Sequence, residues 1–330
     1  MNTTESTNLN TQLNTPTNQT FNYTGTGLDF GLLMLKNIFF SVITLGIYIP
    51  WARTNNRRFI WSNVTLNNDR FTYTGTGKQL FLGAATLFAI LFVAGLAVNI
   101  IQAFLPKHLE PVAGLLVLPG YLYFFALAAY SGLRYRAVNT LWRQLRFGTD
   151  RTKESTKEFL LIFAKGAILS GLTLGLYIPI FTIKKLRFLT GKAHYSGKYF
   201  SFTGQESEYF WLCLKGFLLS VVTLGLYFPW FYISRTNYRI QHTQFGSNSF
   251  KFNLTGGKVF VYFIVGNICT ILTLGLASPW VLNYWNKLFF NNLSIIGPLD
   301  LSNVVNTNTT ENESALGDDV AVEYDIDFGF

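Results

Sequence analysis

Three lysines lie inside apolar segments of this 330-residue sequence, each at the same distance from a recurring motif. Lys36, Lys165 and Lys215 each stand eight positions before the threonine of a Thr-Leu-Gly sequence, and Val265 holds that place in a fourth copy. A charged side chain at the centre of a bilayer costs about 2.5–3.5 kcal/mol on insertion scales. A lysine in an apolar segment is therefore expected to have a functional or structural role. One hypothesis is a lysine cluster that binds an anionic small molecule or an anionic lipid headgroup.

A structural interpretation of the same lysines remains open. Each lysine follows an acidic residue by seven positions, and these acids are Asp29, Glu158 and Glu208. Helix side chains lean toward the N-terminus, so each lysine can extend back toward the acid and the membrane surface. In that interpretation the lysines are solvated and bind nothing.

Other chemistry is not indicated by the remaining reactive side chains. Cys213 and Cys269 lie in apolar segments at unrelated positions, and His108, His194 and His242 have no metal-ligand spacing. No Ser/His/Asp, Cys/His, paired-carboxylate or phosphate-loop set is present. We therefore expect no enzyme activity, no catalytic residues, no metal or other cofactor and no nucleic-acid partner.

The elements that position the lysines end in a repeated motif, Thr-Leu-Gly-apolar-x-x-Pro. Its four copies are Thr44 to Pro50, Thr173 to Pro179, Thr223 to Pro229 and Thr273 to Pro279. Glycine commonly follows the end of a helix, and proline starts a new helix but cannot continue an old one. Each copy therefore predicts the end of one apolar helix and the start of a new segment.

Small or polar residues precede each motif at fixed offsets of three and seven positions, which share one helical face with the threonine. Small residues along one stripe let helices approach closely in lipid. We predict that the four repeat helices pack on one another through this helix-packing stripe. Its residues are Asn37, Ser41, Thr44, Gly166, Ser170, Thr173, Gly216, Ser220, Thr223, Gly266, Thr270 and Thr273.

The composition predicts an α-helical integral membrane protein. Apolar residues make up 49% of the chain and charged residues only 13%, well below the share in soluble proteins. About six apolar segments, near 30–51, 81–104, 112–133, 159–181, 209–233 and 259–281, contain no Asp or Glu and are long enough to cross a bilayer. The linkers between them alternate aromatic and polar residues around turn formers, which predicts short β-hairpins.

The domain organisation follows from an internal repeat of about 50 residues and from two tails. Residues 1–20 are rich in Asn and Thr and are expected to be disordered, as is the acidic segment 300–330. That acidic segment is expected to be solvated, with docking onto the basic loops as the alternative. The membrane repeat domain, 21–299, divides into units 21–70, 71–146 with an inserted helical hairpin at 81–133, 147–199, 200–249 and 250–296.

Two topologies fit these segments. Six crossings with both termini in the periplasm place most Lys and Arg in the inner loops, as the positive-inside rule requires. However, Phe30 to Leu45 is too short for a full crossing if Gly46 ends the helix. In the alternative, each repeat dips into the membrane and returns, and all hairpins share one face and could join one sheet. Aromatic and basic residues after the motifs are predicted interfacial anchors: Trp51, Arg53, Trp230, Arg235 and Trp280.

The motifs resemble the YjgN-like family of bacterial multi-pass inner-membrane proteins of unknown function. The resemblance rests on Phe21–Gly25, on the Thr-Leu-Gly-apolar-Tyr-apolar-Pro-Trp segment and on the arginine-rich stretch that ends in Trp61-Ser-Asn63, and it covers residues 21 to about 296. Ile180 replaces the tryptophan in the second copy, and the fourth copy lacks the tyrosine. The resemblance implies a bacterial inner (plasma) membrane location and no known reaction.

Two functions from different classes are consistent with these features. The first is transport of a small or anionic solute, or lipid binding, through a bundle of broken repeat helices. The second is a non-enzymatic membrane scaffold or envelope-associated assembly protein whose hairpins form a partner surface. Beyond the lipid bilayer itself, the sequence defines neither a partner nor an oligomeric state.

Overall fold

Short strands alternate with pairs of helices along the whole described chain. The computed structural model describes residues 18–104, 106, 110–150 and 152–297, with backbone only for 110–118. Its strands are β1 (Asn18–Tyr23), β2 (Val64–Leu66), β3 (Asp69–Tyr73), β4 (Thr140–Trp142), β5 (Leu145–Thr149), β6 (Ala193–Tyr195), β7 (Lys198–Phe202), β8 (Thr243–Phe245), β9 (Asn248–Phe252) and β10 (Leu293–Ile296). Its helices are α2 (Gly27–Ile43), α3 (Ile49–Ser62), α4 (Gly77–Phe104), α5 (Glu110–Asn139), α6 (Lys153–Leu172), α7 (Ile178–Lys192), α8 (Glu206–Val222), α9 (Phe228–Gln241), α10 (Gly256–Leu272) and α11 (Ser278–Asn291).

The strands form a closed antiparallel barrel. They follow one another around it in sequence order, and β1 pairs with β10 to close the ring. Alternate residues point inward, as the period of two requires, and most inward positions are aromatic. Phe71 lies opposite Trp142, with ring centroids 5.9 Å apart, and Phe200 lies opposite Phe245 at 4.7 Å. The barrel interior is therefore a packed aromatic core.

All helices leave the barrel from the same rim. Because neighbouring strands are antiparallel, the end of each odd-numbered strand and the start of the next even-numbered strand lie at one end of the barrel. A backbone hydrogen bond fastens each such pair, for example Thr24 N–H to the Asn63 carbonyl and Thr203 N–H to the His242 carbonyl, both 2.9 Å. The strand-to-strand turns, such as Asn67–Asn68, form the opposite rim.

Each pair of helices is a hairpin that leaves the rim and returns to it. In four of the five pairs the Thr-Leu-Gly motif makes the reversal. The Thr44 hydroxyl donates to the Phe40 carbonyl (2.7 Å) and accepts from the Tyr48 N–H (3.0 Å), which closes α2 and opens α3. Pro50 then occupies the first turn of α3. The turns therefore lie at the end of the molecule that is farthest from the barrel.

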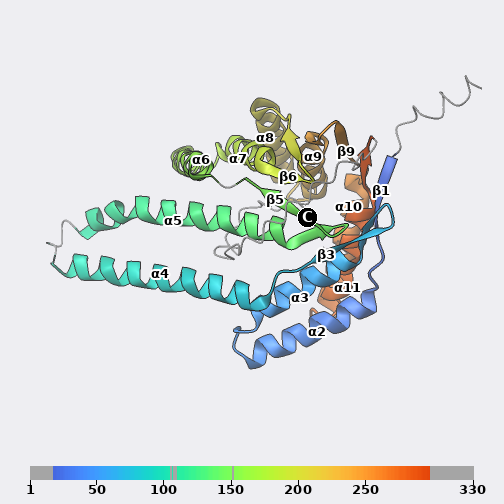
Figure 1. Cartoon of the computed structure of the whole chain (residues 1–330), viewed down its shortest axis with the longest axis horizontal. Helices are drawn as coiled ribbons and strands as arrows, with labels where there is room; N and C mark the ends of the chain where they lie inside the picture. Colours follow the sequence, from blue (N-terminus) through green and yellow to red (C-terminus); the bar gives the residue numbers. More distant parts are fainter. Residues whose placement is uncertain (1–17, 105, 107–109, 151, 298–330) are drawn as a thin grey trace, which may run out of the picture.

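The hairpins pack side by side into a ring of helices (Figure 1). The second helix of each hairpin packs on the first helix of the next, and α11 packs on α2 to complete the circle. The long pair α4 and α5 projects beyond the others (Figure 1) and occupies the region of the predicted inserted hairpin.

The predicted fold class is wrong, although its elements exist. The expected hairpins at 64–73, 193–202 and 244–252 are present, but they join into one closed barrel. Among the described residues, only Gly77–Phe104 is long and apolar enough to cross a membrane. The reason is that the Thr-Leu-Gly turns end the first helices and reverse the chain, so segments counted as single crossings are two short antiparallel helices.

The tail boundaries also need a correction. β1 begins at Asn18 and pairs with β10 through Thr20, so the end of the predicted N-terminal tail belongs to the barrel. The rest of that tail and the acidic segment 300–330 lie outside the described residues.

Candidate functional site: a basic chamber under the barrel

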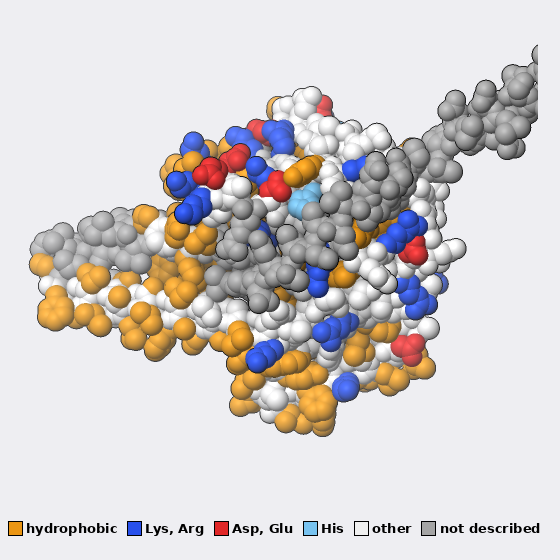
Figure 2. All heavy atoms as spheres, in the orientation of Figure 1, with side chains coloured by type: hydrophobic (Ala, Val, Ile, Leu, Met, Phe, Trp, Pro, Cys, Tyr) orange, Lys and Arg blue, Asp and Glu red, His pale blue; other side chains and the backbone are white. Residues whose placement is uncertain are grey.

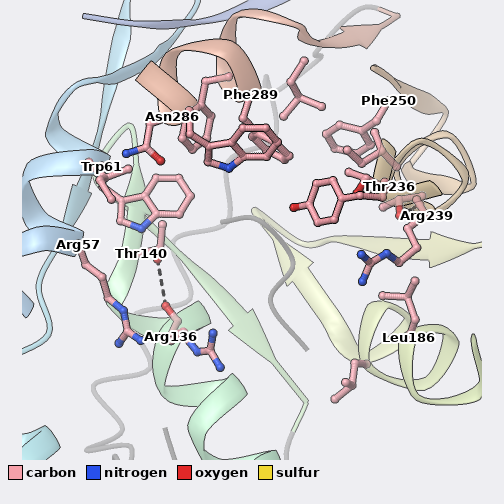
Figure 3. Close-up of a pocket in the computed structure, with 18 of the residues that line it drawn as sticks. Arg57, Trp61, Arg136, Thr140, Leu186, Thr236, Arg239, Phe250, Asn286 and Phe289 are labelled. Carbon is pink, nitrogen blue, oxygen red and sulfur yellow. Dashed lines mark hydrogen bonds between the residues drawn. The ribbon is translucent and has the colours of Figure 1, made fainter. Parts of the chain in front are cut away.

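A chamber of about 390 Å³ lies between the barrel core and the ring of second helices. Each of α3, α5, α7, α9 and α11 contributes to its wall, and strand residues such as Phe250 and Leu293 close the barrel side. Figure 3 shows labelled side chains from these helices, and from strands β4 and β9, around the shared space. We call this space the basic chamber, for the residues described next.

Four cationic side chains from four different hairpins line the basic chamber. They are Arg57 on α3, Arg136 on α5, Lys185 on α7 and Arg239 on α9. Arg136 and Lys185 are buried, with 7% and 5% of their surface exposed. The arrangement places four cationic groups on the wall of one partly open space.

Aromatic and polar neighbours hold these cations in place. Arg57 donates from Nη1 to the Tyr73 hydroxyl at 3.4 Å and lies over that ring. The Lys185 ammonium lies 4.3 Å from the centre of the Phe181 ring, a cation–π contact. The Thr140 hydroxyl donates to the backbone carbonyl of Arg136 at 3.0 Å, the bond that is dashed in Figure 3, and this bond stabilises the end of α5 rather than the guanidinium group.

The rest of the wall is mainly apolar, with both aromatic and aliphatic side chains. Trp61, Trp285 and Phe289 lie on it, and Asn286 supplies an amide from α11. A site of this kind accepts a ligand with an anionic group and an apolar part, because guanidinium groups match phosphate and carboxylate geometry and rings cover the apolar part.

The barrel beside the chamber holds neutral tyrosines. Burial raises the pKa of Tyr23 to about 12, and its hydroxyl donates to Asn283 Oδ1 at 2.7 Å. Burial also raises the pKa of Tyr195, whose hydroxyl donates to the Trp142 carbonyl at 2.8 Å. These groups are structural donors rather than acids or bases near neutral pH.

The three predicted ligand lysines do not line the chamber. Lys36, Lys165 and Lys215 are exposed on α2, α6 and α8, the first helices of three hairpins. These helices pack on intervening second helices and not on one another. In the described part of the chain no ion pair links the lysines to Asp29, Glu158 and Glu208.

The small-residue stripe lies inside each hairpin rather than between repeats. A Cβ on Gly166, Gly216 or Gly266 would come within 2.1, 2.0 or 2.8 Å of a side chain on the following second helix. Those side chains are Phe181, Phe231 and Val281. In the first hairpin Asn37 instead donates to Asn56 on α3 at 2.9 Å. The stripe brings together the two helices of one hairpin.

The predicted anchors Trp51, Trp230 and Trp280 pack between hairpins. Trp51 contacts Phe81 at 5.5 Å between ring centroids, and Trp230 contacts Phe260 at 5.0 Å. Trp280 covers Gly27 and Gly31 at the start of α2. Arg235 donates to the Tyr209 hydroxyl at 3.1 Å, and Arg53 is exposed.

Sequence reasoning did not select the chamber residues as a site. Arg57, Lys185 and Arg239 belong to basic clusters that follow the motifs, and these clusters suit topology signals equally well. Arg136 lies near the end of α5, two residues after Arg134 and outside any of the motif copies. The usable signal was the recurrence of basic residues after the first three motifs, 13, 12 and 16 positions beyond the motif threonine. The described residues contain no group of three or more side chains suited to hold a metal ion.

Together the fold and the chamber define a barrel-and-helix-ring protein with a basic pocket between the barrel and the second helices. The chain belongs to the family described as bacterial proteins of unknown function (DUF898), whose model matches residues 18–201, 197–238 and 228–322. This match and the relatives described next confirm the YjgN-like resemblance.

The similar curated proteins carry one name. The inner membrane protein YjgN of Salmonella typhimurium strain LT2 is 30% identical over 174 residues, which are 53% of this chain and 41% of the relative. The protein of that name from Escherichia coli O157:H7 is 30% identical over 127 residues, 38% of this chain and 30% of the relative. The matched part thus spans less than half of these relatives. No solved structure matches the chain.

Proposed function

We propose that this chain is an inner-membrane protein that binds an anionic group in the basic chamber. The observation that carries the proposal is the convergence of Arg57, Arg136, Lys185 and Arg239, from four hairpins, on one partly open space. The names of the relatives support the location, as does α4, a 28-residue helix with a mean hydropathy of 2.4 over its most apolar part.

The chemistry of the ligand follows from the wall. Ligand sites commonly enclose about 300–1,000 Å³, so a chamber of about 390 Å³ suits a small molecule or one headgroup. Arginine binds phosphate and carboxylate through paired hydrogen bonds, and the aromatic and aliphatic side chains of the wall cover an apolar portion. The shared chemistry is therefore a phosphate or carboxylate group, on a free solute or on a lipid.

The test measures binding to the purified full chain in phosphatidylcholine nanodiscs. Inorganic phosphate is titrated by calorimetry, and phosphatidylglycerol is introduced separately in mixed nanodiscs to distinguish a solute from a lipid. Arg57→Gln combined with Arg239→Gln should weaken the response at least about tenfold, since one hydrogen bond to a charged group contributes about 1.5–3 kcal/mol. Lys36→Gln, an exposed lysine outside the chamber, is the matched control and should change nothing.

Two results would contradict the proposal. One is equal binding by wild type and the double variant. The other is a loss caused by Lys36→Gln that matches the loss caused by the double variant. If binding is confirmed, a liposome flux assay with the same variants then separates transport of the anion from its retention.

A further inference from the structure

The four Thr-Leu-Gly turns present a leucine to the surroundings in the same way. Leu45, Leu174, Leu224 and Leu274 are 94–95% exposed, and the turns that hold them form the far ends of four hairpins. We propose that these turns, which we call the leucine tips, insert into the hydrocarbon of one membrane leaflet. The inference rests on the proposed membrane location and is independent of ligand binding in the chamber.

Each leucine tip holds its leucine in a backbone conformation that carries a free-energy cost. Each leucine has a φ between 49° and 51°, the left-handed region that side chains other than Gly and Asn rarely adopt. That conformation costs about 1–2 kcal/mol for an ordinary residue. With almost all of its surface exposed, the leucine packs too little to offset this cost. Transfer of a leucine side chain from water to an apolar medium supplies about 1.5–3 kcal/mol.

The leucine tips also satisfy their own backbone donors, as a lipid environment demands. In the second hairpin every N–H from Thr173 to Ile178 has an acceptor inside the turn or the preceding helix. The Tyr177 N–H is accepted by the Thr173 hydroxyl, and the Gly175 N–H by the Ser170 carbonyl. The same bonds recur at the other three turns. Water would supply these partners freely at an exposed turn, whereas hydrocarbon supplies none.

The leucine tips are all on one side of the barrel, since all hairpins leave from one rim. The exposed apolar surface also lies on the helical side of the molecule. Among the described residues, the large hydrophobic side chains that are exposed lie on helices and helix turns, apart from Tyr199 on the barrel. Figure 2 shows hydrophobic side chains along α4 and over the turn between α2 and α3. One leaflet can therefore receive all four tips.

The three exposed lysines fit the depth of such an insertion. Lys36, Lys165 and Lys215 each precede the tip leucine by nine residues, about 14 Å along a helix. Half of a bilayer's hydrocarbon is about 15 Å thick. A leucine that reaches toward the bilayer centre therefore leaves the lysine near the phosphates, where the ammonium group is solvated. The lysines then mark the membrane surface around the helix ring.

Fluorescence quenching in proteoliposomes tests the insertion. An environment-sensitive dye is attached to a single cysteine at position 45, 174, 224 or 274, in a chain carrying Cys213→Ala and Cys269→Ala. Ser247→Cys, on the opposite rim, is the control. We expect lipids that are spin-labelled on the acyl chain to quench the fluorescence of all four tip dyes. Iodide, an aqueous quencher, should leave their fluorescence unchanged. The control dye should show the reverse.

The outcomes separate this inference from the proposed location. Tip dyes that iodide quenches, in a chain that floats with the vesicles, would overturn the insertion alone. A chain that does not float would overturn both the location and the insertion.

A second variant tests the role of the leucines without disturbing the turn. Leu45, Leu174, Leu224 and Leu274 are all changed to Asn, which tolerates the left-handed conformation. With the dye on Ile47→Cys, acyl-chain quenching should fall several-fold relative to the leucine-containing chain, while thermal stability in detergent is kept. Unchanged quenching would overturn the inference.

Discussion

The turns at the two ends of this molecule share one backbone conformation, but the side chains are polar at one end and apolar at the other. At the barrel turns, Asn67, Asn68, Arg143 and Gln144 have φ values of 48–66°. At the leucine tips the leucines have φ values of 49–51°. A left-handed residue is required at both ends to reverse the chain, so backbone geometry does not explain the choice of side chain. The difference indicates different surroundings, water at one end and hydrocarbon at the other.

The contrast extends from the turns to the elements behind them. Barrel strands bury aromatic rings such as Phe71 and expose polar residues, whereas α4 exposes rings such as Phe88. The barrel is therefore stabilised by burial within the chain, and the helix surface by burial against lipid. Substitutions at matched positions of the two regions test this division.

The largest expected effect is in the barrel core. Phe71→Ala should lower the free energy of unfolding by about 3–5 kcal/mol, because it removes a buried ring that contacts Trp142 and Phe21. Phe88→Ala removes an equal volume from an exposed position and should change it by less than about 0.5 kcal/mol. Chemical denaturation in detergent measures both. Equal losses would remove the distinction between the two regions.

The next effect is in the packing of a helical hairpin. Gly166→Leu should destabilise the chain by about 3 kcal/mol, since even a Cβ there would lie 2.1 Å from the Phe181 ring. Gly171→Leu, on the same helix with open space around it, should be neutral or slightly stabilising. Thermal unfolding in detergent compares the two. A tolerated Gly166→Leu would contradict the close contact between α6 and α7.

A smaller effect is expected where a threonine completes a turn. Thr223→Val removes the hydroxyl that donates to the Leu219 carbonyl and accepts the Tyr227 N–H, and should cost about 1–3 kcal/mol. Thr65→Val, at a half-buried position on the outer face of β2, should cost less than about 0.5 kcal/mol. The difference between the stability costs of the two substitutions should be larger in nanodiscs than in detergent solution. No difference in either medium would show that the tip does not depend on this cap.

The smallest expected effect is a substitution that keeps or raises stability instead of lowering it. Leu224→Asn should leave stability in detergent unchanged or raise it by up to about 1 kcal/mol, because Asn adopts the left-handed conformation more readily. Ile264→Asn, at an exposed apolar position in the middle of α10, serves as the comparison and should not gain stability. A clear loss at Leu224 would mean that the leucine packs within the protein.

Much of the local structure is visible in the sequence. Thr44 to Pro50 and its copies predict where helices end, and alternating aromatics predict the hairpins later seen as β2–β3, β6–β7 and β8–β9. These features depend on residues close together in the chain. The early start of β1 at Asn18 was missed because its pairing with β10 joins the two ends of the described chain.

The global arrangement could not be predicted in the same way. Barrel closure and the ring of helices are non-local, and apolar residues on both sides of a Thr-Leu-Gly turn are typical of one long helix as well as of two short ones. For the same reason the sequence shows Arg57, Lys185 and Arg239 as basic residues but does not show that their side chains line one pocket. The lysines predicted to bind an anion, such as Lys36, lie on the outer face of the ring.

Cysteine labelling in cells tests the central claim, that the barrel lies on one side of the membrane and all hairpins enter from that side. Single cysteines replace the exposed residues Arg70, Lys198 and Ser247 on three different barrel hairpins, in the background without Cys213 and Cys269. An impermeant maleimide is applied to spheroplasts and to inverted vesicles. All three sites should react in the same preparation and be protected in the other. Labelling that alternates between the two preparations would contradict the account and restore helices that cross the bilayer.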